Sequence, residues 1–122
     1  MSIWLALMCP GMPWASQSID TQDAHLAANQ WRAHYGLHRY DLDEHCCALA
    51  AQHARWMADR DWLVHGTQDQ IIAVGPRNGH NAIAIWAGSP PHFGWLLSDH
   101  RRAGYAHAVS RSGRHYWVGV FR

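Results

Sequence analysis

The 122-residue sequence contains no lysine, and charged side chains make up only 16% of it. An average soluble protein has about 25% charged residues. Ten arginines against nine acidic residues give a formal net charge of +1. This leaves no basic excess to neutralise phosphates, so we expect no nucleic-acid partner. The hydrophobic fraction of 48% is ordinary and argues against disorder.

The sequence also lacks an apolar run of the ~20 residues that a transmembrane helix needs. Its apolar start, residues 1–17, is shorter and ends near the small residues Ala15 and Ser16. This pattern resembles a secretory signal, although no basic residue precedes the apolar stretch. We expect residues 1–17 to be a signal peptide or an apolar N-terminal arm, and residues 18–122 to form one domain. A signal peptide would make the protein secreted or periplasmic, whereas an arm leaves a cytoplasmic location open.

Cysteine is too scarce for a disulfide framework, since the chain has only three. Cys46 and Cys47 are adjacent in a predicted helix, where neighbouring side chains diverge and cannot easily form a bridge. Cys9 lies in the apolar start and would be lost with a signal peptide. We therefore expect buried free thiols.

Two helices are predicted in the first half of the chain. Small and apolar side chains recur at three- and four-residue spacing over residues 20–35, and a glycine then ends the pattern. Asp20 or Thr21 would cap this helix. A second helix would begin after Asp43 as its N-cap and break at residues 59–61.

The second half of the chain changes its period. Residues 63–79 are interrupted by glycine and proline, which predicts a loop. A third helix is predicted over residues 81–88, and a short helical turn over residues 92–97 follows a Ser-Pro-Pro stop. Residues 105–110 and 115–121 are typical of a β-hairpin with a glycine-containing turn. Helices followed by strands, without βαβ alternation, predict an α+β fold.

Local catalytic and metal-binding motifs are absent despite eleven histidines. The sequence has no His-Glu-x-x-His, Cys-x-x-Cys, Gly-x-Ser-x-Gly or phosphate-binding loop. His53 lies on the apolar stripe of the second predicted helix, which favours a hydrogen bond to the backbone over a ligand role. Arg32 and Trp117 are interpreted as structural residues of a small α+β core.

A series of short motifs runs in order from residue 27 to residue 121. The motifs are Asn29-Gln-Trp-Arg32, Gly36-Leu37, Asp43, Ala50-Ala-Gln-His-Ala54, Met57, His65, Ile72-Ala-Val-Gly75, Trp86, Ser89-Pro-Pro-His92, Leu96-Leu97, Gly104 and Tyr116-Trp-Val-Gly-Val-Phe121. Together they resemble the CAP superfamily of cysteine-rich secretory proteins, antigen 5 and plant pathogenesis-related proteins, in its bacterial Ser-Pro-x-His branch. The resemblance implies a three-layer α-β-α sandwich with a small antiparallel sheet between helical layers.

The resemblance also implies a shared cleft. In the family, two histidines and two acidic residues line it, and some members bind zinc or another divalent metal there. Carried onto this sequence, the histidines are His65 and His92. The acidic positions fall on Gln70, where the usual glutamate is missing, and on Ser89, as that branch generally has it. Pro91 replaces the usual glycine before the second histidine.

These departures weaken the expected metal site. Two neutral imidazoles can hold Zn²⁺, but a tetrahedral site needs further donors. Gln70 is an uncharged, poor ligand and cannot act as a general base. Asp69 could supply a carboxylate only if its loop turns towards the cleft. We expect His65 and His92 to face one cleft and to bind a divalent metal weakly or not at all. The alternative is that they only form hydrogen bonds within the scaffold.

Two functions remain open, and the sequence does not decide whether the chain is an enzyme. The first is a secreted binding module for a small apolar molecule, lipid or peptide, because eukaryotic relatives have been linked to sterols and lipids. Candidates for an apolar groove are Trp14, Trp62 and Trp95. The second is a zinc-dependent hydrolase or peptidase, in which an ion held by the two cleft histidines activates water with Asp69 or Glu44 as base.

A third and weaker hypothesis makes Ser89 a nucleophile beside His92. The two prolines between them stiffen the chain, and the sequence shows no third residue to orient the histidine.

Overall fold

The computed structural model describes residues 18–66 and 69–122 of the chain. The predicted signal peptide or arm, residues 1–17, lies outside these residues. The elements follow in the order α2 (Ile19–His34), β1 (Asp41–Leu42), α3 (Glu44–Arg60), β2 (Gln70–Val74), α4 (Gly79–Ala87), α5 (Pro90–Leu96), β3 (Arg102–Val109) and β4 (His115–Phe121).

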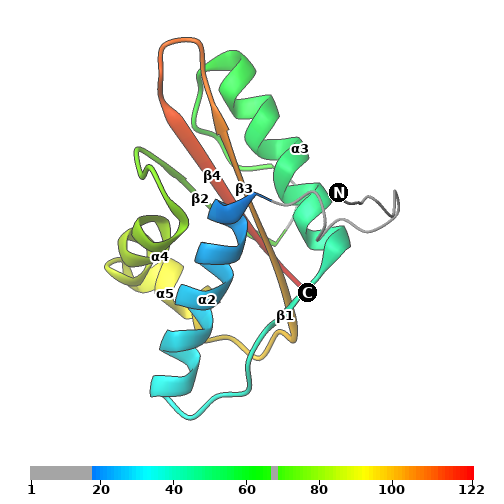
Figure 1. Cartoon of the computed structure of the whole chain (residues 1–122), viewed down its shortest axis with the longest axis vertical. Coiled ribbons are helices and arrows are strands. Elements are labelled where there is room, and N and C mark those ends of the chain that lie inside the picture. The colour runs from blue at the N-terminus through cyan, green and yellow to red at the C-terminus, as the bar shows by residue number, and fades with distance from the viewer. Residues whose placement is uncertain (1–17, 67–68) are drawn as a thin grey trace, which may run out of the picture.

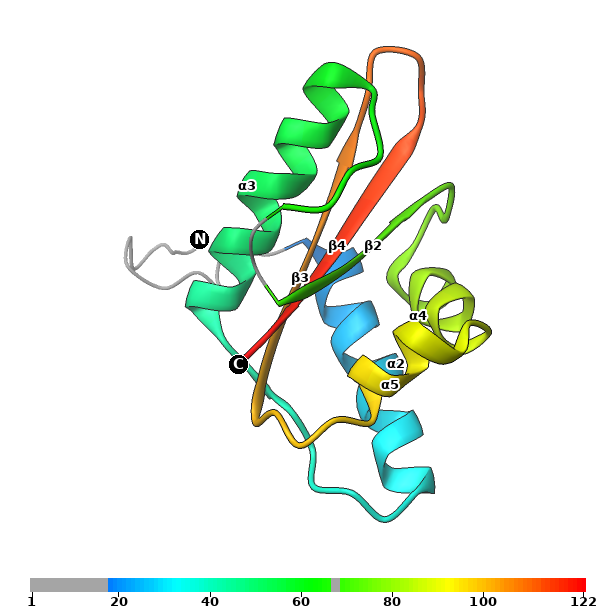
Figure 2. The same cartoon turned by 180° about the vertical axis from the view of Figure 1, so that it is seen from behind.

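The strands form one sheet, in the order β1-β3-β4-β2, between two helical layers. Helix α3 covers one face, and α2, α4 and α5 cover the other (Figures 1 and 2). The predicted α+β fold and α-β-α sandwich are confirmed. The sheet is mixed rather than antiparallel throughout, because the short β1 pairs parallel with β3. Strand β4 pairs antiparallel with both of its neighbours.

Strand β2 lies in a segment that the sequence predicted to be a loop. The prediction of a loop over residues 63–79 is wrong for residues 70–74, which pair with β4. Ile71 packs in the core beneath α2 and α4, whereas Ile72 packs in the core beneath α3. A strand buried on both faces has no polar alternation, so a short apolar run between glycine and proline residues did not indicate it.

The N-cap of α2 also differs from the prediction. Ser18 caps the helix, and its Oγ accepts a hydrogen bond from the Thr21 backbone N–H at 3.2 Å. Thr21 is buried instead, and its hydroxyl donates to the Tyr105 carbonyl at 3.0 Å. This bond ties the first turn of α2 to β3, so Thr21 serves packing between layers rather than capping.

The start of α3 agrees with the prediction. Asp43 is the N-cap, and its Oδ2 accepts from the Cys46 backbone N–H at 2.8 Å. Cys46 and Cys47 are free and buried, as expected. Burial raises the pKa of the Cys46 thiol to about 12, which keeps this group protonated and unreactive.

Arg32 confirms its structural role by anchoring the end of α2. The side chain is fully buried. Its guanidinium donates to the carbonyls of His38, Leu96 and Ser98 at 2.6, 3.1 and 2.8 Å, and it lies 3.9 Å from the Tyr40 ring centroid. Buried charges require such hydrogen bonds to offset desolvation. Arg32 therefore joins α2 to the end of α5.

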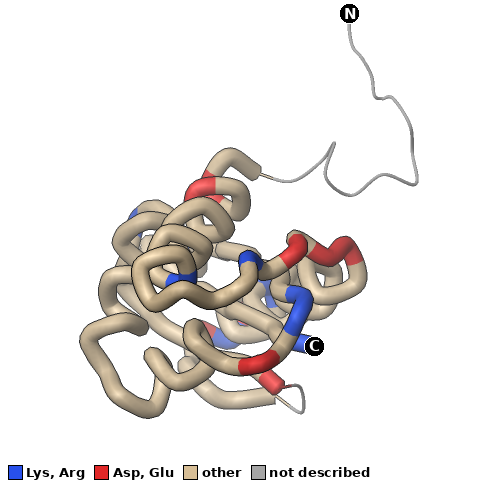
Figure 3. The backbone as a smooth tube through the Cα atoms, turned by 90° about the horizontal axis from the view of Figure 1, so that it is seen from below, with Lys and Arg blue, Asp and Glu red and all other residues tan. Residues whose placement is uncertain are grey.

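Charges of the two signs are dispersed over the fold. Figure 3 shows arginine and acidic positions interspersed along the backbone rather than gathered by sign.

None of the described helices is long and apolar enough to cross a membrane.

Gly104 allows α3 to lie directly against β3. A Cβ at this position would overlap the backbone N of Cys47 and the carbonyl carbon of Cys46, and would lie 2.7 Å from Cys46 Cβ. Most of these are helix backbone atoms, so they can move away only if α3 itself shifts.

We expect Gly104→Ala to lower the free energy of unfolding by about 1–3 kcal/mol or more, because it overpacks the contact between α3 and the sheet. The matched control is Gly94→Ala in α5, where a Cβ would meet nothing within 4 Å. This control should be neutral or slightly stabilising, since alanine favours a helix over glycine. Urea unfolding measures both. A Gly104→Ala protein as stable as the wild type would contradict the close packing.

Candidate functional site

A cleft of about 380 Å³ opens beside α3. Its lining residues come from α3, from the segment that follows it, and from the first position of β2: Leu49, Gln52, His53, Trp56, His65, Gly66 and Gln70. Two of the residues expected at the site, His65 and Gln70, therefore share this cleft. Leu49 and Trp56 supply apolar lining, which we call the apolar wall, and Gln52, His53, His65 and Gln70 supply polar side chains.

Trp62, a candidate for an apolar groove, lies beside Trp56 but is not among the lining residues of the cleft. It is 58% exposed, and its ring centroid lies 6.1 Å from that of Trp56. Trp95, another candidate for a groove, stacks instead on Phe121 at 5.8 Å within the core. Trp14 lies outside the described residues.

His92 lies in the first turn of α5, behind the two prolines that begin this helix. Proline favours such first-turn positions. Burial is the main cause that lowers the pKa of His92, and the charge of His65 lowers it further. Of the two expected histidines, only His65 is among the described lining residues of the cleft; His92 is not. His92 Nδ1 is buried and has no hydrogen-bond partner in the described part of the chain.

Gln70 is 4% exposed, and one hydrogen bond sets the orientation of its side chain. Its Oε1 accepts from the Gly66 backbone N–H at 2.8 Å. An N–H group can donate only to the amide oxygen, so the nitrogen must occupy the other position. Gln70 Nε2 is buried, and no described residue accepts a hydrogen bond from it.

His53 shapes the cleft by holding the segment that follows α3. Its Nε2 lies 2.7 Å from the Val64 carbonyl, so this nitrogen carries the proton and donates it. The hydrogen bond to the backbone that the sequence favoured is thus present. The ring also stacks on Trp56, with centroids 5.6 Å apart. A Cβ on Gly66 would lie 3.0 Å from His53 Nδ1, so this approach favours glycine.

The residues around the cleft do not fit a tight zinc site. Within residues 18–66 and 69–122, no group of three or more His, Cys, Asp or Glu side chains is placed to hold a metal. Asp69 is 70% exposed, and its carboxylate lies 4.0 Å from His100 Nε2. Glu44 lines a separate cavity of about 490 Å³. His65 and His92 together would supply only two of the four donors of a tetrahedral set.

His100 also contacts Ser98, in an arrangement with Asp69 that resembles a nucleophile, a base and an acid. Ser98 Oγ lies 2.7 Å from His100 Nδ1 and 2.7 Å from the Tyr40 hydroxyl, which itself donates to the Trp95 carbonyl. The Tyr40 proton is committed, so Ser98 must donate to the Tyr40 oxygen and accept from His100. Ser98 is therefore not activated, and the chain of bonds is structural.

The hypothesis of a Ser89 nucleophile gains no support. Ser89 is the N-cap position of α5, but its side chain makes no capping hydrogen bond. His92 Nδ1 has no partner among the described residues, so this nitrogen does not hold the Ser89 hydroxyl.

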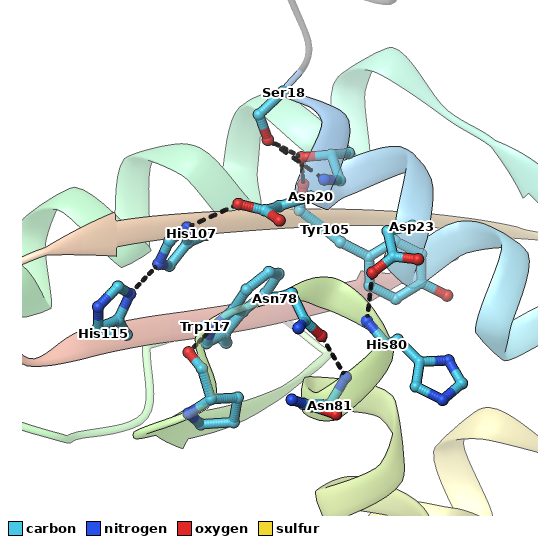
Figure 4. Close-up of polar contacts among 12 residues, drawn as sticks. Ser18, Asp20, Asp23, Asn78, His80, Asn81, Tyr105, His107, His115 and Trp117 are labelled. Carbon is cyan, nitrogen blue, oxygen red and sulfur yellow. Dashed lines mark hydrogen bonds and ion pairs between the residues drawn. The ribbon is translucent and has the colours of Figure 1, made fainter.

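A second histidine cluster was missed by the sequence analysis (Figure 4). His107 on β3 lies 3.5 Å from Asp20 Oδ2 through Nδ1 and 2.7 Å from His115 Nδ1 through Nε2. Its ring stacks on Trp117 at 4.4 Å. The predicted hairpin was the available signal, because its register brings residues 107 and 115 close on facing strands.

Burial disfavours the protonated form of His107. It is the main cause that lowers the pKa of His107, and the charge of His115 lowers it further. Asp20 opposes this shift because its negative charge favours protonation. Burial is also the main cause that lowers the pKa values of His25 and His92.

These three shifts predict that acidification destabilises the fold. Below the ordinary histidine pKa of about 6.5, the unfolded chain binds more protons than the folded chain, so the free energy of unfolding falls as pH decreases. Urea unfolding at about pH 7.5 and pH 5.5 should show this loss. His107→Gln should reduce the pH dependence, whereas the exposed His80→Gln control should retain it. Wild-type stability that is constant or rises on acidification would contradict this account.

A family model supports the kinship that the motifs indicated. The model of the cysteine-rich secretory protein family, CAP, matches residues 26–121. Among curated protein sequences, none shows a significant match to this chain.

Solved structures show the same fold at low sequence identity. An outer surface protein from Borrelia burgdorferi is 15% identical and has a TM-score of 0.73, over 82% of this chain and 89% of that protein. An extracellular protein containing an SCP domain from Bacillus anthracis is 17% identical and has a TM-score of 0.66, over 93% of this chain and 45% of that protein. MpPR-1i is 12% identical, with a TM-score of 0.67 over 82% and 87% of the two chains. The chain therefore belongs to the cysteine-rich secretory protein, or CAP, family, whose model covers residues 26–121.

Proposed function

We propose that this chain is an extracellular binding module whose ligand occupies the cleft between α3 and β2. The observation that carries the proposal is the unpartnered, buried Nε2 of Gln70 in the wall of a cleft of about 380 Å³. Ligand sites typically combine an apolar cavity of about 300–1,000 Å³ with a few polar groups that orient the ligand. Trp56 and Leu49 supply the apolar surface of such a site.

The size of the cleft limits its ligand to a small apolar molecule, one lipid chain or a peptide side chain. Secretion through a signal peptide in residues 1–17 is part of the same proposal. It is supported by two solved structures of similar fold, one of an outer surface protein and one of an extracellular protein.

A zinc-dependent hydrolase in the same cleft is the alternative, and it has less support. This mechanism needs a metal with an open coordination position and a base beside it. The carboxylate of Asp69 contacts His100, and Glu44 lines the separate cavity. The available donors therefore suit ligand binding better than metal-assisted hydrolysis.

We further propose that any zinc at this cleft binds weakly and needs both histidines. Calorimetric zinc titration of the wild type and of the double variant His65→Ala/His92→Ala tests this. The wild type should release only a small heat of binding, because its ligand set is incomplete, and the double variant should lose this heat, because it lacks both imidazoles. Equal heats from the two proteins would remove the metal proposal.

Filling the cleft tests the binding function itself. Gln52 is exposed on α3 and lines the cleft, so Gln52→Trp should obstruct it. The matched control is Gln22→Trp, at an exposed position on α2. A library of neutral and charged fragments is screened by NMR, and binders should shift the Trp56 indole N–H and the Gly66 amide. We expect Gln52→Trp to reduce this binding at least about tenfold, a change of about 1.4 kcal/mol, while Gln22→Trp leaves it unchanged.

Two outcomes would contradict the binding function. One is a screen in which no fragment shifts the cleft signals. The other is a set of binders whose affinity Gln52→Trp leaves unchanged, since those ligands would lie elsewhere on the molecule.

A further inference from the structure

We propose that the cleft recognises a carboxylate, and that the side-chain N–H₂ group of Gln70 donates a hydrogen bond to it. This inference rests on the proposed binding function and names the chemical class of its ligand: a small organic carboxylate with an apolar group.

The hydrogen bond from Gly66 sets the polarity of the Gln70 side chain. The bond from the Gly66 N–H uses Oε1, which leaves Nε2 as the free end of the side chain. A glutamate at this position could accept the same bond with one oxygen and would offer its second oxygen at the free end. That oxygen could bind a cation, whereas the amide nitrogen of Gln70 only donates. With glutamine in place of glutamate, position 70 therefore favours a hydrogen-bond acceptor in the ligand, whereas glutamate would favour a cation.

The amide nitrogen of Gln70 lacks an acceptor in the described part of the chain. The side chain is buried, since Gln70 is 4% exposed. Nearly all buried polar groups in native proteins have a hydrogen-bond partner, and an unsatisfied one destabilises the fold. A ligand oxygen that accepts from Nε2 would satisfy this group.

The other groups that line the cleft are compatible with an anionic ligand. The lining of the cleft contains His65 but no aspartate or glutamate, so no lining charge repels an anion. His92 is not among these lining residues. The imidazole of His65 can donate an N–H, as can the amide of Gln70. A carboxylate presents two oxygens with about four acceptor positions, whereas a single carbonyl oxygen presents two.

The apolar wall would contact the uncharged part of the ligand. Leu49 and Trp56 face the same cleft, and His53 is committed to the Val64 carbonyl through its Nε2–H. A ligand that places its charged end at Gln70 would therefore contact apolar side chains with its other end. This geometry favours an aryl or alkyl carboxylate over acetate.

The experiment compares carboxylates with their neutral amides on the full chain. NMR titrations use benzoate, phenylacetate and hexanoate, each beside the corresponding primary amide. Ligands of about ten non-hydrogen atoms reach dissociation constants on the order of 1 mM. We expect at least one carboxylate to bind about tenfold or more tightly than its amide and to shift the Gln70 side-chain N–H₂ signals.

Variants of Gln70 assign the donor. Gln70→Glu replaces the free donor by an acceptor, and Gln70→Met removes the donor without adding charge. Both should weaken carboxylate binding about 10- to 100-fold, the range expected for a hydrogen bond to a charged group. Gln52→Glu, which adds the same charge at an exposed position of the cleft, should have a smaller effect. Gln70→Glu should also gain zinc affinity relative to the wild type. Circular dichroism shows which variants fold. If Gln70→Glu does not fold, Gln70→Met alone tests the role of the donor.

The outcomes separate this inference from the proposed function. Amides that bind as tightly as carboxylates, or carboxylate binding that survives both Gln70 variants, overturn the inference while the cleft remains a binding site. If no carboxylate binds but neutral fragments still bind in the cleft, the inference also fails alone. If no fragment of any kind binds in the cleft, the proposed function fails with it.

Discussion

The hydrogen bond between the Gly66 N–H and Gln70 Oε1 is the contact on which the cleft depends. It joins the segment after α3 to the first residue of β2, and both ends are held in place by other contacts. His53 binds the neighbouring Val64 carbonyl, and Gln70 is paired with Val120 of the central strand β4. The bond therefore sets two properties at once: the shape of the cleft wall and the polarity of the group that Gln70 presents.

The layered fold positions the elements on either side of this contact. Strand β4 contributes Trp117 to the core beneath α2 and α4, and Val118 to the core beneath α3. On the α3 face, Gly104 removes the side chain that would keep the helix away from the sheet. The α3 side chains that line the cleft are thus held close to the edge where β2 begins. The proposed binding cleft lies at this junction between a helix, a loop and a strand, as is common for binding sites.

Much of the fold could be predicted from the sequence, because the signals are local. Helical spacing and the Asp43 cap indicated α3, and a change of period indicated the hairpin of β3 and β4. Strand β2 was missed because its burial on both faces removes the alternation that identifies a strand. The cap of α2 was misplaced because Thr21 binds the Tyr105 carbonyl, a contact between layers that no local pattern shows.

The candidate site could be predicted only in part. His65 and His92 were paired through a resemblance rather than through spacing. In the structure, His65 lines the cleft, whereas His92 lies in α5 and is not among the lining residues. The partner of Asp69, His100, lies far along the chain and had no signal. The substitution at Gln70 was visible in the sequence, but its consequence was not. Which atom of the amide is left without a partner depends on the position of the Gly66 N–H, which the sequence alone does not show.

The most direct measurement of the central claim is a high-resolution crystal structure of the full chain with the tightest-binding carboxylate. We predict a carboxylate oxygen within about 3 Å of Gln70 Nε2, while Gln70 Oε1 still accepts from the Gly66 N–H. A carboxylate bound outside the cleft would contradict the account, as would a Gln70 amide turned so that its nitrogen points away from the ligand.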